Sequence, residues 1–394
     1  MSVKIDKNKI EEILTRGVSE VIDLKHLREK LMSGKKLKVK LGIDPTSPNI
    51  HIGRSVALLK LRDFQELGHE IVFIVGDFTG MVGDTSDKDS ERPMLSEEQI
   101  KKNMKDYVNQ AGRIINIKKA KIEHNSKWLK KLNFGEIGKL ANQFSLGEFI
   151  ARENIRKRLQ EEKHVSLREL IYPLMQGYDS VAIKADVELG GTDQRFNLLA
   201  GRTLQEYYGQ EPQDILMTNL ILGTDGRKMS SSWGNTINVT DEPKDMFGKV
   251  MSISDDLIIT YFVHCTRVDM DKIMGYEKKL LSETTNPRDI KIELAYEIVR
   301  IYWGEKGAEK GKNHFVSVFQ KRDLPDEIQE YKLAGRDIVD VLVETNLATS
   351  RGDAKRLIEH GGIEIDGEEI KSIDITVNHG SIIQKGKRFF AKIV

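Results

Sequence analysis

The feature that most constrains this chain is a strand–helix–strand pattern between residues 36 and 77. The segment KKLKVKLGID alternates polar and apolar residues, as strands do, and Pro45 and Pro48 then mark a loop. Apolar residues at helical spacing follow, and Gly68 is expected to end that helix. The next segment, EIVFIV, is typical of a strand buried in a parallel sheet. Short links between the three elements predict a right-handed βαβ unit.

The same order of elements returns later in the chain. VAIKADVELGG is predicted as a strand, Thr192 is expected to cap a helix from Asp193 to Tyr208, and DILMTNLIL is predicted as a second strand. Two such halves indicate an α/β fold with a doubly wound parallel sheet. Sheets of this kind bind ligands beyond the carboxyl ends of their strands, where glycine-rich loops meet helix N-termini. The loops at which we expect a site are residues 42–53, 76–92 and 190–194.

The character of the sequence changes after Thr240. The next segment is mostly charged and compatible with helices, with breaks at Pro287 and Pro325, so it predicts a helical domain. The last stretch combines two helix signals with an Asp366-Gly367 hairpin signal, which predicts a small α+β module. The predicted domains are residues 1–240, 241–332 and 333–394.

Charge and cysteine content exclude several classes of protein. Lys plus Arg total 62 against 61 Asp plus Glu, so any contact with nucleic acid must come from local patches. The single cysteine, Cys265, excludes intramolecular disulfides and cysteine-rich metal cages, and we expect it to be buried. The N-terminus lacks the apolar core of a secretory signal, and no apolar run approaches ~18 residues. We therefore expect a cytoplasmic protein with no membrane partner.

Two short segments carry the strongest signal for chemistry. Residues 51–54 read HIGR, and residues 228–232 read KMSSS. They resemble the HIGH motif and the KMSKS loop of class I aminoacyl-tRNA synthetases, whose Rossmann-like catalytic domain binds ATP between the two. A helix N-terminus supplies backbone N–H groups and positive field for phosphates, and Gly53 lets a nucleotide approach the backbone closely.

The resemblance implies which residues act on ATP. Charge moves towards pyrophosphate as the α-phosphorus is attacked, so hydrogen-bond donors and cations are needed there. The implied catalytic residues are His51, Thr46, Lys88, Arg92, Lys228 and Arg54. The implied ATP-binding residues are Asp44, His51, Gly53, Gly191, Asp193, Lys228, Met229 and Ser231. We expect Mg²⁺ to arrive with ATP, and we expect no metal bound by the protein itself.

A third segment concerns the amino acid. Tyr172, Gln176 and Asp179 would lie on one face of a helix, and a buried polar face needs partners. Their spacing resembles that of tyrosyl-tRNA synthetases, in which the Asp accepts a hydrogen bond from the phenol while the Tyr and Gln hold the ammonium group. Phenylalanine would leave Asp179 buried and unpaired, and this family is the usual example of such discrimination.

Two loops extend the resemblance. Gly190 to Gln194 is similar to the family's GG[ST]DQ element, which implies that Asp193 accepts the ribose hydroxyls. Residues 76–92 are similar to a stretch in which Lys88 and Arg92 lie on a loop over the pyrophosphate. The implied tyrosine-binding residues are Asp84, Thr79, Tyr172, Gln176, Asp179, Gln194, Lys40 and Gly42.

The C-terminal module is similar to the S4 RNA-binding domain of bacterial-type tyrosyl-tRNA synthetases. Its residues Arg351, Lys355 and Arg356 would lie close together on a helix and suit contacts with RNA phosphates. A solvated helix face explains the same charges, because acidic and basic residues nearly balance in this module. A second basic cluster is a candidate for contact with the tRNA acceptor stem, with a solvated helix as the alternative: Arg152, Arg156, Lys157 and Arg158.

Three positions depart from the family pattern. Arg54 replaces the last His of HIGH, Ser231 replaces the second Lys of KMSKS, and Lys40 stands where many members place a second tyrosine against the phenol. Arg54 keeps a hydrogen-bond donor and adds a permanent charge. The loss of a cation at Ser231 leaves Lys88 and Arg92 to compensate, and the change at Lys40 leaves recognition of the phenol mainly to Asp179.

The sequence therefore predicts a tyrosine–tRNA ligase. It would convert tyrosine and ATP to tyrosyl-adenylate and pyrophosphate, then transfer the tyrosyl group to the terminal ribose of tRNA(Tyr), and the resemblance implies a homodimer. A tryptophanyl enzyme shares the fold, but Asp179 and the S4-like module argue against it. Two alternatives remain: an inactive paralogue that binds RNA, which Arg54 and Ser231 favour, and a general nucleotidyltransferase, which leaves the C-terminal module unexplained.

Overall fold

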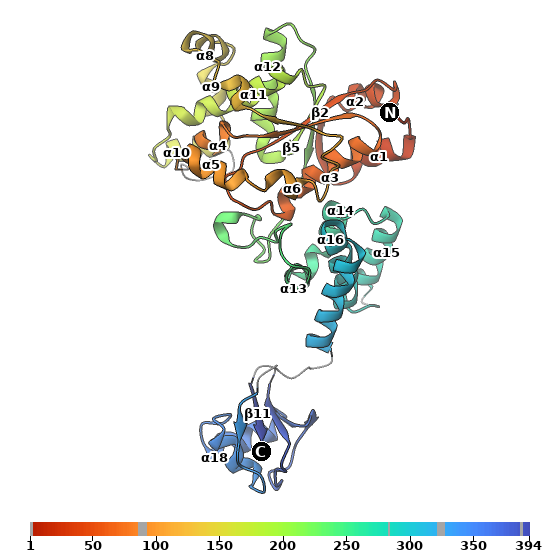
Figure 1. The fold of residues 1–394 in the computed structure, drawn as a ribbon, viewed down its shortest axis with the longest axis vertical. Helices are drawn as coiled ribbons and strands as arrows, with labels where there is room; N and C mark the ends of the chain where they lie inside the picture. The colour runs from red at the N-terminus through yellow and green to blue at the C-terminus, as the bar shows by residue number, and fades with distance from the viewer. Residues whose placement is uncertain (1–2, 86–92, 283, 321–327, 387–388) are drawn as a thin grey trace. The chain divides into compact units, whose positions relative to one another are not determined.

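The computed structural model describes residues 3–394 except 86–92, 283, 321–327 and 387–388 (Figure 1). Contacts divide the chain into two compact units, Met1–Asn313 and His314–Val394. The three predicted domains are a finer division than these two units.

A six-stranded sheet forms the centre of the first unit, in the order β1-β6-β5-β2-β3-β4. The strands are β1 (Val18–Ile22), β2 (Lys38–Ile43), β3 (Glu70–Val75), β4 (Lys121–His124), β5 (Val187–Gly191) and β6 (Asp214–Thr218). Strand β2 pairs in parallel with both β3 and β5, and β4 and β6 continue the parallel order outward. This confirms the doubly wound sheet, to which β1 adds an antiparallel edge strand.

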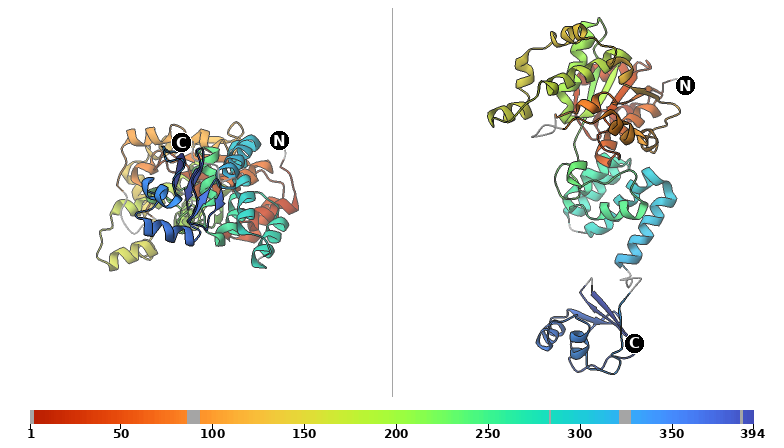
Figure 2. Two further views of the ribbon diagram at one scale, coloured as in Figure 1. Left: turned by 90° about the horizontal axis from the view of Figure 1, so that it is seen from below. Right: turned by 60° about the vertical axis from the view of Figure 1, so that its left-hand side comes forward.

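Helices cover both faces of this sheet (Figures 1 and 2). The crossover helices are α3 (Ile52–Glu66), between β2 and β3, and α12 (Arg195–Tyr207), between β5 and β6. Helix α11 (Leu167–Ile183) precedes β5 and packs along α12. The other helices before β5 are α1 (Lys7–Thr15), α2 (Leu24–Met32), α4 (Thr79–Val82), α5 (Glu97–Met104), α6 (Tyr107–Ala111), α7 (Ser126–Leu129), α8 (Phe134–Ala141), α9 (Leu146–Ile150) and α10 (Glu153–Gln160).

The chain order reverses between β2 and β5. From β2 the chain builds outward through β3 and β4, and from β5 it builds in the opposite direction through β6. Such a switch point opens a crevice at the carboxyl ends of the strands, because the crossover helices leave to opposite faces there. The fold therefore places a candidate site above β2 and β5.

The structure corrects three local predictions. Only the second half of VAIKADVELGG is a strand, because α11 continues to Ile183 and buries Val181 against Leu204 of α12. Periodicity alone does not separate such a buried helix end from a strand. A 3-10 helix over Thr192–Gln194 precedes α12, so Thr192 does not cap it. The last predicted strand ends at Thr218.

The region after β6 is helical, as predicted. It contains short 3-10 helices over Ser231–Trp233 and Asp255–Leu257 and the helices α13 (Pro243–Met251), α14 (Ile258–Cys265), α15 (Met270–Leu281) and α16 (Pro287–Gln320). The Tyr302 hydroxyl of α16 lies 2.5 Å from Ser55 Oγ of α3, and Arg16 donates to the carbonyl oxygens of Phe262 and Val268. These buried contacts explain why the helical segment up to Asn313 belongs to the first unit. Cys265 is fully buried, as expected.

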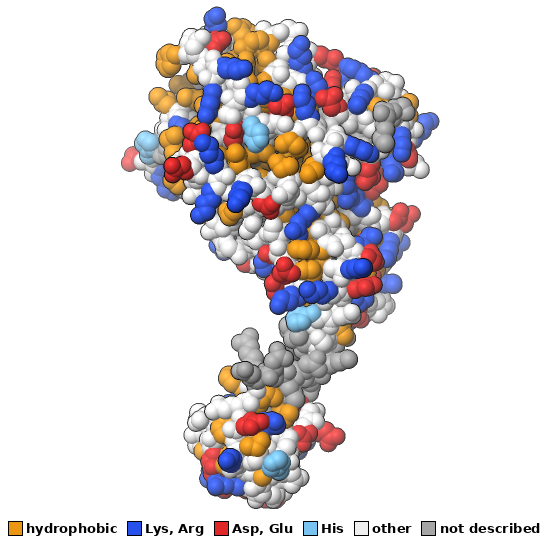
Figure 3. All heavy atoms as spheres, viewed as in Figure 1, with side chains coloured by type: hydrophobic (Ala, Val, Ile, Leu, Met, Phe, Trp, Pro, Cys, Tyr) orange, Lys and Arg blue, Asp and Glu red, His pale blue; other side chains and the backbone are white. Residues whose placement is uncertain are grey.

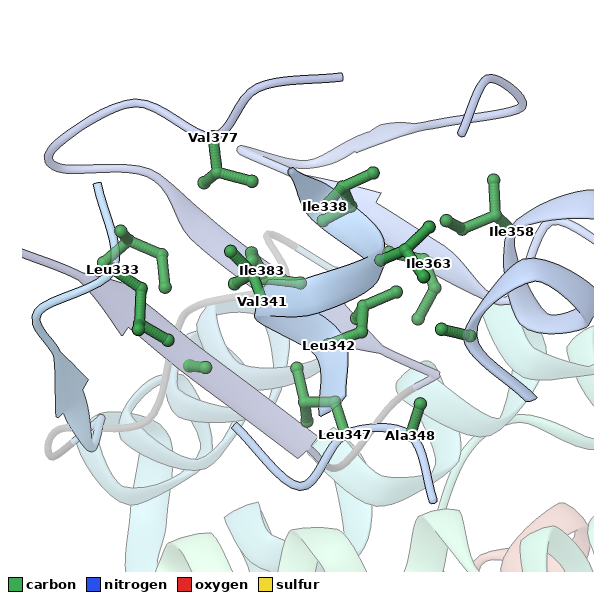
Figure 4. Packing of buried hydrophobic residues seen from close by; sticks show 14 residues of the cluster. Leu333, Ile338, Val341, Leu342, Leu347, Ala348, Ile358, Ile363, Val377 and Ile383 are labelled. Atoms are coloured by element: carbon green, nitrogen blue, oxygen red, sulfur yellow. The ribbon is translucent and has the colours of Figure 1, made fainter. Parts of the chain in front are cut away.

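The second unit contains the α+β module predicted for residues 333–394. A sheet in the order β7-β11-β10-β8-β9 packs with two helices. These elements are β7 (Glu330–Tyr331), α17 (Ile338–Glu344), α18 (Arg351–Glu359), β8 (Ile363–Ile365), β9 (Glu368–Glu369), β10 (Ile382–Lys385) and β11 (Phe389–Ile393). Figure 4 shows Val341, Leu342 and Ile383 in its core. Asp366 and Gly367 join β8 to β9 with positive φ, as a two-residue hairpin turn of this type requires.

Candidate active site

A cavity of about 780 Å³ lies at the switch point, beyond the carboxyl ends of β2, β3, β5 and β6. All the predicted catalytic, tyrosine-binding and ATP-binding residues that the structure describes, except Lys40, line it. These are Gly42, Asp44, Thr46, His51, Gly53, Arg54, Thr79, Asp84, Tyr172, Gln176, Asp179, Gly191, Asp193, Gln194, Lys228, Met229 and Ser231. Lys88 and Arg92 fall outside the described residues. The cavity thus unites segments that lie far apart in the chain.

His51 stands immediately before the first residue of α3 and is buried. Its burial, with the charges of Arg54 and Lys228, lowers the pKa of the imidazole to about 3, so the ring is neutral at pH 7. Among the described residues, nothing hydrogen-bonds its Nδ1 atom. A Cβ at Gly53 would lie 2.9 Å from that nitrogen, which explains the glycine of the HIGR segment. This end of the cavity offers a neutral imidazole beside a helix N-terminus.

Arg54 holds the loop that precedes α3. Its guanidinium donates to Thr46 Oγ1 at 3.0 Å, to the Asp44 carbonyl oxygen at 3.2 Å and to the Tyr107 hydroxyl at 3.1 Å. A planar fork of donors suits this role, because one side chain can fix three acceptors at once. Arg54 therefore brings a permanent positive charge to the cavity wall and fixes the position of Thr46.

Asp44 is the acceptor at the end of β2. Its two carboxylate oxygens accept hydrogen bonds from Thr79 Oγ1 at 2.7 Å and from the Tyr172 hydroxyl at 2.8 Å. Burial raises the pKa of this carboxyl to about 6, although the two hydrogen bonds favour its charged form. A Cβ at Gly76 would overlap Asp44 Oδ1, so the loop after β3 requires glycine there.

Asp179 is held by two residues that the sequence analysis missed. The Trp128 indole Nε1 donates to Asp179 Oδ1 at 2.7 Å, and Asn125 Nδ2 donates to Oδ2 at 3.2 Å. Asn125 and Trp128 follow β4, so a strand signal in KIEH would have placed them at the carboxyl edge of the sheet. Burial raises the pKa of Asp179 to about 7, against the charge of Lys40 and these two hydrogen bonds.

Two further contacts close the opposite side of the cavity. Lys228 Nζ lies 2.9 Å from Asp193 Oδ2, and Gln194 Nε2 donates to Asp84 Oδ2 at 2.6 Å. The serine hydroxyls of Ser47 and Ser231 lie 3.3 Å apart, which joins the loop before HIGR to the KMSSS segment. The two predicted nucleotide motifs are therefore neighbours.

Lys40 is placed differently from its prediction. It does not line the cavity, and its side chain is about 1% exposed. Its Nζ atom lies 3.0 Å from Glu188 Oε1 and donates to Ser180 Oγ at 2.6 Å and to the Gln176 carbonyl oxygen at 3.1 Å. Glu188 on the adjacent strand holds the ammonium group in a buried ion pair.

The two predicted basic clusters differ in their exposure. Lys355 and Arg356 are exposed on α18, and Arg351 is exposed and paired with Asp340. In the other cluster, the prediction that Arg158 contacts tRNA is wrong, because Arg158 is buried and its guanidinium binds the carboxylate of Glu169. Arg156 and Lys157 remain exposed on α10.

Among the described residues, no group of three or more His, Cys, Asp or Glu side chains is placed to hold a metal ion. No helix in the described part of the chain has the length and apolarity needed to cross a membrane.

Comparisons with known proteins match nearly the whole chain. A family model for class I tRNA synthetases (W and Y) matches residues 32–320, and a model for the tyrosine–tRNA ligase SYY-like C-terminal domain matches residues 320–392. The chain is 45% identical to the tyrosine–tRNA ligase of Thermotoga maritima, over 97% of this chain and 96% of the relative. It is 44% identical to that of Carboxydothermus hydrogenoformans, over 97% of each.

Solved structures share the fold. The tyrosyl-tRNA synthetase of Archaeoglobus fulgidus, complexed with L-tyrosine, superposes with a TM-score of 0.62 at 23% identity. The match covers 78% of this chain and all of that one.

The raised pKa of Asp179 predicts a pH dependence of stability. The carboxyl of the folded protein loses its proton near pH 7, whereas that of the unfolded chain is already ionised above ~pH 4. Its contribution to stability is therefore lost as the pH rises through 7. The free energy of unfolding of the wild type, minus that of Asp179→Asn, should fall by ~1.4 kcal/mol between pH 6 and pH 8. Urea denaturation at both pH values measures this, and a difference independent of pH would contradict the assignment.

Proposed function

This chain belongs to the tyrosine–tRNA ligases, class I aminoacyl-tRNA synthetases that form tyrosyl-tRNA from tyrosine, ATP and tRNA, and we propose how its cavity divides that reaction among the residues present. The observation that carries the proposal is the buried Asp179, whose two oxygens are fixed by Trp128 and Asn125. A carboxylate held in this way accepts a hydrogen bond from the phenol of tyrosine. Phenylalanine is rejected because it would desolvate Asp179 without supplying a donor.

The polar head of tyrosine lies between α11 and the end of β2 in this proposal. Tyr172 and Gln176 of α11 bind the ammonium group, and Asp84 and Thr79 complete the amino-acid site. The Asp44 carboxylate accepts hydrogen bonds from both Thr79 and Tyr172. Its negative charge attracts the ammonium group of tyrosine while both hydrogen bonds stay in place. Gln194 contacts the carboxyl region, and its bond to Asp84 joins the two sides. Gly42 leaves room, since a Cβ there would meet nothing within 4 Å.

ATP occupies the HIGR and KMSSS side of the cavity. The neutral imidazole of His51, the hydroxyl of Thr46 and the charges of Lys228 and Arg54 meet the phosphates as pyrophosphate leaves. Asp193 accepts the ribose hydroxyls, and Gly53 and Gly191 let the nucleoside pass close to the backbone, beside Met229 and Ser231. Lys88 and Arg92 are proposed to close over the pyrophosphate.

The reaction needs no covalent enzyme intermediate. The tyrosine carboxylate attacks the α-phosphorus, pyrophosphate leaves, and a terminal ribose hydroxyl of tRNA then takes the tyrosyl group. The residues described here supply position and charge stabilisation, which suffice for this class of transfer. Asp44 and Asp193 already accept hydrogen bonds or an ion pair from the protein, so Mg²⁺ is proposed to enter on the triphosphate of ATP.

The tRNA is proposed to contact both units. Arg351, Lys355 and Arg356 of α18 bind its phosphates, supported by their exposure. Arg156 and Lys157 of α10 are candidates for the acceptor stem. The single buried cysteine and the substrates support a cytoplasmic location.

A second copy of the chain is the proposed partner of an apolar face on the first unit. Phe134 of α8 is 91% exposed and Leu167 of α11 is 77% exposed, and Ile171 lies one turn further along α11. Helix α9 adds Leu146 and Ile150. Figure 3 shows hydrophobic side chains gathered at the end of this unit that carries α8 and α12. Soluble monomers rarely expose such a face, and the family resemblance supports a homodimer.

We expect ATP–pyrophosphate exchange with tyrosine and none with phenylalanine or tryptophan, in the absence of tRNA. Asp179→Ala should lower kcat/KM for tyrosine by ~100-fold or more, because the phenol loses its acceptor. Circular dichroism controls for folding. Unchanged exchange in this variant would contradict the assigned pocket, and a folded wild type that is inactive with every amino acid would favour the RNA-binding paralogue.

Replacing Arg351, Lys355 and Arg356 together by Gln should weaken binding of tRNA(Tyr) by ~10-fold at 150 mM salt and flatten its salt dependence, because three phosphate contacts are lost. Filter binding across a salt series measures this. Lys371→Gln, another exposed lysine of the same unit, is the matched control and should bind normally. Equal effects of the triple change and the control would contradict the proposed RNA surface.

Phe134→Asp combined with Leu167→Asp should convert a dimer to a monomer, because two charges would be buried at the interface. Sedimentation equilibrium measures the mass. Phe389→Asp, an equally apolar exposed position in the second unit, should leave the dimer intact. A wild type that sediments as a monomer at micromolar concentration would refute this interface.

A further inference from the structure

A lysine and a glutamate form a buried ion pair directly beneath the amino-acid site. Lys40 of β2 and Glu188 of β5 face each other in the register of the two central strands, and each side chain is about 1% exposed. The charged atoms lie 3.0 Å apart. Burying such a pair costs solvation energy that the mutual attraction often fails to recover, so stability alone is a weak reason for its presence. Its contacts with α11 point to another role.

The Glu188 carboxylate is saturated by donors, two of which belong to α11. Gln176 Nε2 donates to Oε1 at 3.1 Å and Ser180 Oγ donates to Oε2 at 3.1 Å. Gln213 Nε2 also donates to Oε2. An ionised carboxylate only accepts hydrogen bonds, so it requires the NH₂ end of the Gln176 amide to face it. Gln176 lines the cavity, and its amide oxygen is then the end left for a ligand.

Lys40 is equally saturated. Its three ammonium hydrogens are matched by Glu188 Oε1, Ser180 Oγ and the Gln176 carbonyl oxygen. It has no donor left for a substrate, so it acts through its partners. Two of those partners, Gln176 and Ser180, are one turn apart on α11, on either side of Asp179 in the sequence. The positive charge of Lys40 also opposes the rise in the pKa of Asp179.

We propose that Lys40 and Glu188 are positioning residues of the tyrosine site: Glu188 selects the amide orientation in which Gln176 presents its oxygen to the ammonium group, and Lys40 neutralises Glu188 while anchoring this turn of α11. An ammonium group can only donate hydrogen bonds. In the opposite orientation of the Gln176 amide, the hydrogens of its NH₂ group would face those of the ammonium group. The inference rests on the proposed role of Gln176 in binding the ammonium group.

The test is Glu188→Gln, which keeps the shape but lets the residue offer either an oxygen or an NH₂ group to Gln176. KM for tyrosine in ATP–pyrophosphate exchange should rise ~10-fold, while KM for ATP stays within ~2-fold. Two competitive inhibitors then separate positioning from general damage. The Ki of tyramine, which keeps the ammonium group, should rise by the same ~10-fold, or ~1.4 kcal/mol. The Ki of 3-(4-hydroxyphenyl)propionate, which lacks it, should change by less than ~2-fold.

Asp214→Asn is the matched control. Asp214 is also a fully buried carboxylate of the central sheet, paired with Lys30 at 3.2 Å, but it begins β6 and does not line the cavity. Its variant should keep the wild-type KM for tyrosine. A second variant, Lys40→Met with Glu188→Met, leaves no buried charge unpaired and guards against misfolding of the single change. It should show the same selective loss of tyramine binding.

The outcomes separate the two proposals. Equal weakening of both inhibitors would show a merely structural role for Glu188, and unchanged binding of both would refute the positioning role. Either result, with a wild type active on tyrosine, overturns this inference alone. A wild type without tyrosine-dependent exchange would instead overturn the proposed function from which it follows.

Discussion

Each buried carboxylate at the switch point needs hydrogen-bond donors in fixed positions. Much of the structure around the cavity supplies these donors. Helix α11 supplies three of the donors at intervals of one turn: Tyr172 to Asp44, and Gln176 and Ser180 to Glu188. The same helix also carries Asp179, so its rotation and depth decide the geometry of the whole amino-acid site. A helix that slid or turned would leave several buried acceptors without donors at once, which is costly for each.

The site is built at the expense of stability. Burial raises the pKa values of Asp44 and Asp179, so keeping both ionised at neutral pH works against folding. His51 shows the opposite side of the same effect, because burial keeps its ring neutral. The apolar core of the first unit offsets the unfavourable burial of these groups. A ligand that donates hydrogen bonds to the buried carboxylates stabilises them and therefore gains binding energy.

The sequence predicted the features that depend on local pattern. The β2–α3–β3 unit, the polar face of α11 and the Asp366-Gly367 turn follow from periodicity and turn chemistry, and the motifs placed the cavity residues. The misses depend on partners far along the chain. Nothing near Lys40 reveals that Glu188 will stand beside it, and nothing near Arg158 predicts its burial against Glu169. Asn125 and Trp128 were missed because β4, the short edge strand that precedes them, has only a weak strand signal in the sequence.

The contact of Lys40 with Glu188 also constrains how sequences of this kind can change over time. Losing either residue alone leaves a charge uncompensated inside the sheet, at a cost of ~3–5 kcal/mol, which is comparable to a large share of a domain's stability. Replacing both by uncharged residues of similar volume avoids that cost. We therefore expect the two positions to change together, because a sequence that keeps only one of the two charges bears this cost.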